Sequence, residues 1–388
     1  MAQVDYEPLR KYAYTLRQFE TLDALKDSPS VSAAAKKLGV TKSKVLETVR
    51  RIKERKAKHD SGEHLKGVSP DPYSIKGTSV LYDQDGGVKQ YWVKNEVDKQ
   101  KEALAQQEAV KALCESIKPV KPVKSPKNSL KDLLNCYIIT DYHMGMLAWS
   151  EETRDDDWDT DIAEQLLYQW FREAITSSPN SEVGVLAQLG DFLHYDGLEA
   201  VTPTANNVLD ADSRFQKVVR VSIRVFRRVI DDLLKKHKKV HVIMAEGNHD
   251  IASSVWLREL FSALYEKEPR VTVDLSPDPY YCVEHGKTSL FFHHGHKKKP
   301  ANIDHVFAAK FREIFGRTEH SYGHMGHLHH KEVKESNLMI IEQHRTLASL
   351  DAYASRGGWI TGRDASVITY AKDYGEVGRV TINPKMVA

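Results

Sequence analysis

The chain has 388 residues, of which 41% are hydrophobic and 28% are charged. This composition excludes a largely disordered chain, and the length suggests two or three domains. No stretch approaches the roughly 18 consecutive apolar residues of a membrane span, and the start of the chain lacks the apolar core of a secretory signal. The cysteines Cys114, Cys136 and Cys282 are too widely spaced for a metal-binding pair and odd in number. We therefore expect a cytosolic protein that does not act at a membrane.

The two ends of the chain differ in charge. Of the 56 Lys and Arg and 54 Asp and Glu in the chain, residues 1–128 hold 25 and 17. The basic front is expected to attract a polyanion, while the acidic remainder has carboxylates available for cations. The alternative is that the charged residues are distributed by chance over solvent-exposed surfaces. Prolines alternate with lysines over 116–129, which predicts an extended linker between the two parts.

Three helices are predicted within residues 1–58. Apolar residues at three- and four-residue steps indicate a helix over 8–28. Ser30 or Ser32 can cap a short second helix that ends at Gly39. A third helix is expected from a cap at Thr41 to about residue 58, with inward-facing Val45, Leu46, Val49 and Ile52.

A short helix, a glycine turn and a basic helix together are typical of a helix-turn-helix that binds DNA. An ordinary three-helix bundle with a solvated basic face is the alternative. The residues expected to meet bases or phosphates lie on the third helix and are Lys42, Ser43, Lys44, Arg50 and Arg51. Residues 59–128 are predicted to hold a β-hairpin around Asp83–Gly87, a polar helix over 97–117 and the linker. The hairpin could be the wing of a winged helix.

From residue 129 to 388 strands alternate with helices, as in an α/β domain. The first strands are expected over 136–140, 183–189 and 240–245, and helices over 160–176, 208–236 and 254–267. After about residue 270 short strands dominate, over 272–275, 280–284, 289–293, 339–343 and 377–382.

Polar motifs follow the predicted strands at their carboxyl ends, where open α/β sheets place their sites. In chain order these motifs read DYH from 141, GD from 190, GNHD from 247, HGH from 294 and GHLH from 326. Carboxylate, amide and imidazole ligands without thiolates suit Mn²⁺, Fe²⁺ or Zn²⁺. One such motif alone is more often structural or incidental. Five in this order predict a site for two divalent cations, because a carboxylate can bridge a metal pair.

This series of motifs resembles the calcineurin-like metallophosphoesterase superfamily over roughly residues 130–345. The resemblance implies a two-sheet α/β sandwich flanked by helices, here preceded by the small helical domain. It implies that Asp191 bridges two metals, of which Mn²⁺ is the first expectation. The other implied metal ligands are Asp141, His143, Asn248, His294, His327 and His329. The resemblance also implies that His249 is the catalytic histidine and that Asp250 orients it.

The resemblance implies a phosphoester hydrolase in which the metals activate a water and His249 stabilises charge or protonates the leaving oxygen. Combined with the helix-turn-helix, it is similar to the DNA-repair nuclease branch and to bacteriophage phosphoesterases with such a front domain. We therefore expect a DNA phosphodiesterase, either an exonuclease or an endonuclease. A phosphomonoesterase or protein phosphatase, and a DNA-binding regulator without activity, are the alternatives.

Several further residues could bind the substrate. The insertion 194–214 could rim the site, so His194 and Arg214 are candidates, although Arg214 could instead pair with Asp210 or Asp212. Lys297 begins a lysine run beside a ligand loop. The remaining candidates combine Arg with Gly and Trp: Arg356, Arg363 and the neighbouring Trp359, for which a place in the core is the alternative.

Overall fold

The computed structural model describes residues 6–60, 73–82, 88–97, 120–203 and 205–387. The chain divides into two compact units, Met1–Leu104 and Ala105–Ala388. The boundaries at residues 58 and 128 stay predictions. None of the helices in the described part of the chain is long and apolar enough to cross a membrane.

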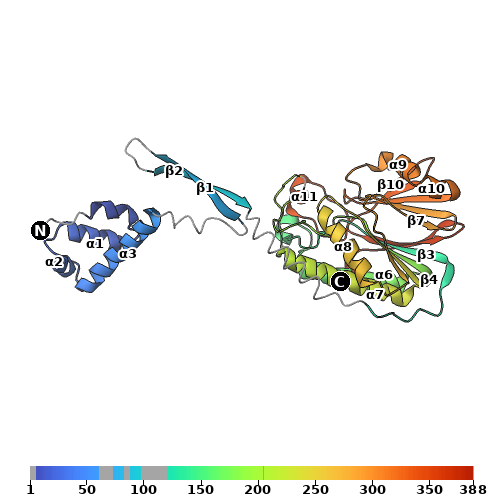
Figure 1. Cartoon of the computed structure of the whole chain (residues 1–388), viewed down its shortest axis with the longest axis horizontal. Helices are drawn as coiled ribbons and strands as arrows, with labels where there is room; N and C mark the ends of the chain where they lie inside the picture. The colour runs from blue at the N-terminus through green and yellow to red at the C-terminus, as the bar shows by residue number, and fades with distance from the viewer. Residues whose placement is uncertain (1–5, 61–72, 83–87, 98–119, 204, 388) are drawn as a thin grey trace. The chain divides into compact units, whose positions relative to one another are not determined.

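The first unit contains a 3-10 helix and three α-helices, which are drawn in blue in Figure 1. They are η1 (Glu7–Tyr12), α1 (Leu16–Lys26), α2 (Val31–Lys37) and α3 (Lys42–Asp60). Leu22, Ala34 and Ile52 meet in its core. The predicted caps are present: the Ser30 hydroxyl accepts a hydrogen bond from Ala33 N at 3.2 Å, and that of Thr41 accepts one from Lys44 N at 3.3 Å.

Two local predictions for these helices are wrong. The helix expected over 8–28 is broken, because the backbone of Ala13 is extended between η1 and α1. The two pieces can therefore bury Leu9 and Leu25 from different directions. Leu46 was expected inside but is 49% exposed, since Val45 and Val49 occupy the inward face of α3.

An antiparallel hairpin of β1 (Tyr73–Tyr82) and β2 (Val88–Val97) also belongs to the first unit. The two strands flank residues 83–87, as the sequence predicts for a hairpin. The predicted turn at 83–87 and the predicted helix over 97–117 lie, apart from residue 97, outside the described residues.

Residues 120–129 have no regular structure but do not form a free spacer. Val120 N donates to Leu264 O at 3.0 Å, and Val123 N donates to the Glu268 carboxylate at 2.9 Å. Arg270 also donates to Val123 O at 2.7 Å. The prediction of a linker is thus wrong for residues 120–123, because the backbone groups of Val120 and Val123 find partners elsewhere in the second unit, to which they belong.

The second unit contains two mixed sheets, seen on the right of Figure 1. The six-stranded sheet has the spatial order β13 (Gly375–Ile382), β12 (Ala365–Ala371), β3 (Leu130–Ile139), β4 (Ser181–Gln188), β5 (Lys239–Met244) and β6 (Val271–Val273). Its four strands from β3 to β6 are parallel. The five-stranded sheet has the order β10 (Glu332–Glu335), β11 (Ile340–Gln343), β9 (His320–Met325), β8 (Thr288–Phe292) and β7 (Tyr281–His285).

The two sheets stack on each other, and helices cover their outer faces. Side chains along β3 alternate: Leu134, Cys136 and Ile138 pack toward Leu290 and Phe292 of the other sheet. On the opposite face, Tyr137 and Ile139 pack with the long helices α6 (Thr160–Ser177), α7 (Phe215–Lys236) and α8 (Ile251–Leu264). The other outer face is covered by α9 (Ile303–Lys310), followed by α10 (Arg312–Arg317).

The predicted two-sheet α/β sandwich is present. The predicted strands are all found with shifted ends, but β9, β10, β12 and the helices α9, α10 and α11 (Ala352–Gly357) were not predicted. The helix expected from residue 208 begins only at Phe215, because the preceding backbone is engaged elsewhere: Asp210 O accepts from Leu147 N and Asp212 N donates to Gly145 O, both at 3.0 Å.

Candidate metal centre

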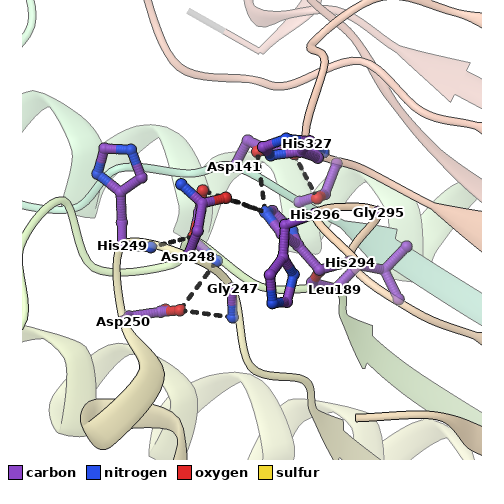
Figure 2. A network of polar contacts seen from close by, with 12 residues as sticks. Asp141, Leu189, Gly247, Asn248, His249, Asp250, His294, Gly295, His296 and His327 are labelled. Carbon is purple, nitrogen blue, oxygen red and sulfur yellow. Dashed lines mark hydrogen bonds and ion pairs between the residues drawn. The ribbon is translucent and has the colours of Figure 1, made fainter. Parts of the chain in front are cut away.

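The predicted metal ligands meet at the carboxyl ends of β3, β4, β5, β8 and β9. Five loops therefore supply one site, although its residues are up to 188 positions apart in the sequence. Figure 2 shows part of this cluster, with Asp141, Asn248, His294 and His327 turned toward one another. The structure brings all seven predicted ligands together in two groups.

The first group contains Asp141, His143 and His329, whose ligand atoms all lie within 4.8 Å of one another. His329 Nε2 is 3.2 Å from Asp141 Oδ1 and 3.4 Å from His143 Nε2. The other carboxylate oxygen of Asp141 accepts hydrogen bonds from the Thr140 hydroxyl at 2.6 Å and from His327 N at 2.8 Å. Asp141 is thus held by one oxygen and presents the other to the imidazoles.

The second group contains Asp191, His294 and His327. His294 Nε2 is 3.1 Å from Asp191 Oδ2 and 3.1 Å from Asn248 Oδ1. The other ring nitrogen of His294 pairs with Leu189 O at 2.8 Å, which fixes the ring orientation. Since the same Nε2 is 3.9 Å from Asp141 Oδ1, the two groups adjoin.

The backbone of the site is strained. Among the described residues, seven that are not glycine have positive φ, and five of these are predicted ligands: Asp141, His143, Asp191, His327 and His329. Left-handed backbone is unfavourable for such residues and persists where the surrounding structure enforces it, often at functional sites. The fold therefore holds these residues in an unfavourable backbone conformation that directs their side chains toward one point.

Two glycines allow the close approach of the loops. A Cβ on Gly247 would lie 1.9 Å from Asp191 Oδ1, and one on Gly326 would lie 1.8 Å from the Thr140 hydroxyl oxygen. Neither contact is sterically possible, so only glycine permits the ligand loops to touch here.

The donor set fits divalent cations. Asp141 Oδ1 is fully buried and faces the imidazole nitrogens of His329 at 3.2 Å and His294 at 3.9 Å, an arrangement in which a cation would stabilise the carboxylate. Burial lowers the pKa of His294, but Asp191 and Asp141 outweigh it and raise that pKa to about 9. The surroundings of these carboxylates thus favour positive charge. Oxygen and imidazole donors without thiolate are typical of Mn²⁺, Fe²⁺ and Zn²⁺ sites.

His249 lies beside the first group. Its ring is 4.9 Å from the ring of His143, and its Nδ1 pairs with His194 O at 2.8 Å. The predicted substrate residue His194 is itself buried, with Nδ1 3.3 Å from His143 Nδ1. Burial lowers the pKa of His194 to about 3, so this imidazole is neutral. It supports the two histidines around it and is not an exposed residue at the rim of the site.

Asp250 does not orient His249 as predicted. Its carboxylate instead accepts hydrogen bonds from four backbone amides, at 2.7 to 3.2 Å. The donors are Asp191, Phe192, Leu193 and Gly247. Asp250 thereby fixes the loop that carries Asp191, while the main chain of His194 positions His249.

The predicted substrate-binding arginines are placed differently from expectation. Arg363 is mostly buried and pairs with Asp156 at 2.6 Å and Asp155 at 3.4 Å. Arg356 pairs with Glu152 on α5 (Ser150–Thr153). Arg363 therefore ties parts of the fold together, whereas the Arg356 side chain is 78% exposed and forms a surface pair. Arg214 is exposed at the start of α7, and neither Asp210 nor Asp212 pairs with it among the described contacts. Lys297 is exposed in the loop after His294.

The predicted DNA-binding residues are all exposed along α3. Lys44 and Arg51 pair with Glu47 at 3.6 and 2.6 Å, and Arg50 pairs with Glu54 at 3.6 Å. These surface pairs within one helix are weak and exchange readily for a phosphate.

Some residues of the site gave no usable sequence signal. The Thr346 hydroxyl donates to Asp141 O at 2.6 Å from 205 residues away, and the Thr361 hydroxyl donates to His329 O at 2.9 Å. Thr140 could have been found, because it directly precedes Asp141 at the end of a strand. The buried His324, Glu342 and His344 also adjoin one another, with His324 two residues before the motif that begins at Gly326.

No protein-family model matches the sequence, and no curated protein does so either. Among solved structures, the chain is similar to a predicted phosphoesterase from Streptococcus pneumoniae, with 10% identity and a TM-score of 0.25 over 66% of this chain and 99% of that one. It is also similar to an archaeal phosphodiesterase, with 12% identity and a TM-score of 0.33 over 64% of this chain and 99% of that one. A third similar structure is Vps29 with Zn²⁺ from Entamoeba histolytica, with 10% identity and a TM-score of 0.28 over 65% of this chain and 99% of that one. Similarity at this level does not decide the activity, which has to follow from the site itself.

Proposed function

We propose that this chain is a two-metal-dependent phosphodiester hydrolase that cleaves DNA. One observation carries the proposal: two adjoining groups of carboxylate and imidazole side chains meet at the carboxyl ends of strands from both sheets. Such paired sites suit the in-line displacement at a phosphorus centre, because both the attacking and the leaving oxygen need charge stabilisation.

The residues of each group have distinct tasks. Asp141, His143 and His329 would hold one cation and Asn248, His294 and His327 the other, with Asp191 between them. Two divalent cations bound there would polarise the phosphoryl oxygens and lower the pKa of a water. Mn²⁺ is the cation we expect first, with Fe²⁺ and Zn²⁺ as alternatives.

His249 is the residue proposed to move a proton. Because its Nδ1 pairs with a backbone carbonyl, Nδ1 carries a hydrogen and Nε2 is left for the substrate. In the imidazolium form, Nε2–H can donate to a phosphoryl oxygen or protonate the leaving oxygen.

The first unit supports DNA as the substrate. Within residues 1–58, α2 and α3 meet at Gly39, which has a φ of +64°, as in a helix-turn-helix. The exposed basic side chains of α3 would contact bases and phosphates, and the hairpin would be an adjacent wing. Residues 59–128 would connect this module to a catalytic domain over 129–388. Exonuclease and endonuclease activity are both compatible with this arrangement.

One assay tests the proposal. The full chain is incubated with Mn²⁺, Fe²⁺ or Zn²⁺ and with labelled single- and double-stranded DNA, bis-(p-nitrophenyl) phosphate and p-nitrophenyl phosphate. Cleavage of DNA and of the diester is expected, and Asp191→Asn should abolish both. Activity confined to the monoester would indicate a phosphomonoesterase or protein phosphatase instead. DNA binding without turnover by any metal would indicate a regulator.

A further inference from the structure

We propose that Trp359 and Tyr353 form a stacking surface for an unpaired nucleobase next to the candidate metal centre. This inference rests on the proposed function and specifies its substrate: a nucleotide whose base is free to stack, in a single strand or as a free nucleoside phosphate. We refer to these two side chains as the aromatic pair.

Trp359 of the aromatic pair adjoins the first group of ligands. Trp359 lines the same pocket as His143 and His329. Two residues after Trp359, the hydroxyl of Thr361 donates to the backbone oxygen of His329 at 2.9 Å. Trp359 therefore forms part of a wall that a substituent of a phosphate ester at the metal centre could reach.

Both rings are unusually exposed. Trp359 is 57% and Tyr353 is 72% exposed, and the adjacent Ile360 is 79% exposed. The expectation that Trp359 could belong to the core is therefore wrong. Exposed apolar side chains that gather beside a polar site are typical of ligand-binding surfaces. The two ring centroids are 5.2 Å apart and the rings are inclined by 56°.

The aromatic pair is also held in place. Tyr353 lies on α11, whose N-terminal residue Asp351 accepts a hydrogen bond from Ala354 N at 2.7 Å. Gly358 has a φ of +74° and turns the chain back, so that Trp359 N donates to Ala354 O at 3.0 Å. The indole packs over Gly357, where a Cβ would lie 2.8 Å from it. A preorganised ring loses little entropy on binding a ligand.

The charges around the aromatic pair favour a base over a further phosphate. The arginines of this region are neutralised by carboxylates: Arg363 by Asp155 and Asp156, Arg356 by Glu152 and Arg345 by Asp364. A wall with aromatic faces and no excess positive charge suits a flat, uncharged ring. Stacking on aromatic side chains is the usual way in which proteins hold unpaired bases, and it requires the base to leave a duplex.

The test compares two single-stranded oligomers of equal length with Mn²⁺: oligothymidylate, and an abasic oligomer with the same phosphates. The full chain is expected to cleave oligothymidylate with at least tenfold higher kcat/KM. Trp359→Leu should remove this preference, with a loss of about tenfold or more on oligothymidylate and none on the abasic oligomer. Tyr353→Leu should act in the same direction. Tyr374→Leu is the matched control, since Tyr374 is 77% exposed in the turn between β12 and β13.

Equal losses on both oligomers, or none with Trp359→Leu, would overturn the inference. A binding measurement separates it from the proposed hydrolysis. With EDTA present, oligothymidylate should quench tryptophan fluorescence in the unmodified chain and less in Trp359→Leu. Base-dependent quenching without cleavage in the first assay would support the stacking surface and reject the nuclease. Cleavage without base preference and without quenching would support the nuclease and reject the stacking surface.

Two further ligands identify the source of the base. Quenching by thymidine monophosphate as strong as that by oligothymidylate indicates a free nucleotide, and quenching by the oligomer alone indicates a strand. Either result supports the stacking surface. Equal quenching by a blunt-ended duplex, whose bases are paired, would contradict it.

Discussion

At the scale of single residues, His249 is the side chain on which the proposed proton transfer depends. It lies next to His143 but is held by a backbone carbonyl, so its removal leaves the predicted ligands in place. His249→Ala is expected to lower kcat on bis-(p-nitrophenyl) phosphate by about 10²- to 10⁴-fold. Elemental analysis should find unchanged metal content. His305→Ala serves as control because His305 is 79% exposed. Wild-type kcat in His249→Ala would exclude this role.

Asp250 allows a second test, because the role found for it differs from the predicted one. Asp250→Asn replaces a carboxylate oxygen that accepts backbone N–H bonds with an NH₂ group. The NH₂ group of the asparagine would then face backbone N–H groups, so that hydrogen-bond donors face donors. The free energy of unfolding is therefore expected to fall by about 1–3 kcal/mol. Metal content should fall as well, since the loop carrying Asp191 is released. Both quantities are measured, by urea unfolding and by elemental analysis.

A different pattern in Asp250→Asn would restore the original prediction. If stability and metal content stay at wild-type values and only kcat falls, Asp250 acts through His249 and not through the loop. Asp304→Asn provides the comparison, because Asp304 is a buried carboxylate bonded mainly to the neighbouring His305.

The residues that the sequence predicts as ligands lie together in the structure, whereas most of the residues that support them were not predicted, for a physical reason. Ligands occur as short motifs such as DYH and GHLH, in which the chemistry and the turn are encoded together. Arg356 and Arg363 also occur in a suggestive motif, but their partners Glu152 and Asp156 lie about two hundred residues away. Whether an arginine is free for a phosphate depends on such distant pairing, which a single sequence does not reveal.

At the scale of elements, a buried histidine joins β3, β4 and α7. His237 ends α7, and its ring lies between the Tyr137 hydroxyl at 2.9 Å and Ser181 O at 2.9 Å. Burial lowers its pKa to about 4. The unfolded chain, with a pKa near 6.5, therefore binds this proton at a higher pH than the folded chain does.

This difference in pKa predicts how stability depends on pH. The contribution of His237 is fully present above about pH 6.5 and is lost as the pH falls toward 4, by about 3 kcal/mol. His237→Gln should therefore show a shallower fall of unfolding free energy between pH 6.5 and 4 than the unmodified chain. Urea unfolding at several pH values measures it, with His305→Gln as control. Parallel curves would show that His237 does not set this dependence.

Element boundaries show what hydrophobic pattern can and cannot determine. The strands β3, β4 and β5 were found because their carboxyl-terminal halves are buried on both faces and mostly apolar. The strands β9 and β10 were missed, since His320, Glu332 and Lys334 give them a polar sequence. Their pairing is set by the neighbouring strands β8 and β11, and not by their own pattern.

At the scale of the whole molecule, the stacking of two sheets is not visible in the sequence. Side chains alternate along β3, so that Cys136 and Ile138 face the five-stranded sheet and Tyr137 faces the helices. The sequence around β3 does not show which face packs on a sheet and which on helices. The two-sheet architecture was predicted from the family resemblance, which rests on the metal-ligand motifs. The motifs thus predicted more of the fold than the periodicity did.

The two units have different proposed roles, DNA binding for the first and hydrolysis for the second, and this difference leads to the last prediction. If the first unit holds DNA through its basic surface, removing that surface should weaken DNA binding without affecting the hydrolysis of a small diester. The variant neutralises four of the exposed basic residues of α3, by the substitutions Lys42→Ala, Lys44→Ala, Arg50→Ala and Arg51→Ala. The control neutralises four exposed basic residues of the second unit: Arg172, Arg220, Lys235 and Lys239.

Binding to a DNA duplex is measured at several salt concentrations in the presence of EDTA. Each lost phosphate contact should reduce the slope of log K against log salt concentration by about one, because one fewer counterion is released. The α3 variant is expected to lose several units of slope and to keep the wild-type rate on bis-(p-nitrophenyl) phosphate, whereas the control keeps both. An unchanged slope in the α3 variant would place DNA binding elsewhere. A loss of diester hydrolysis in that variant would mean that the two units do not act independently, because α3 would then contribute to the chemistry itself.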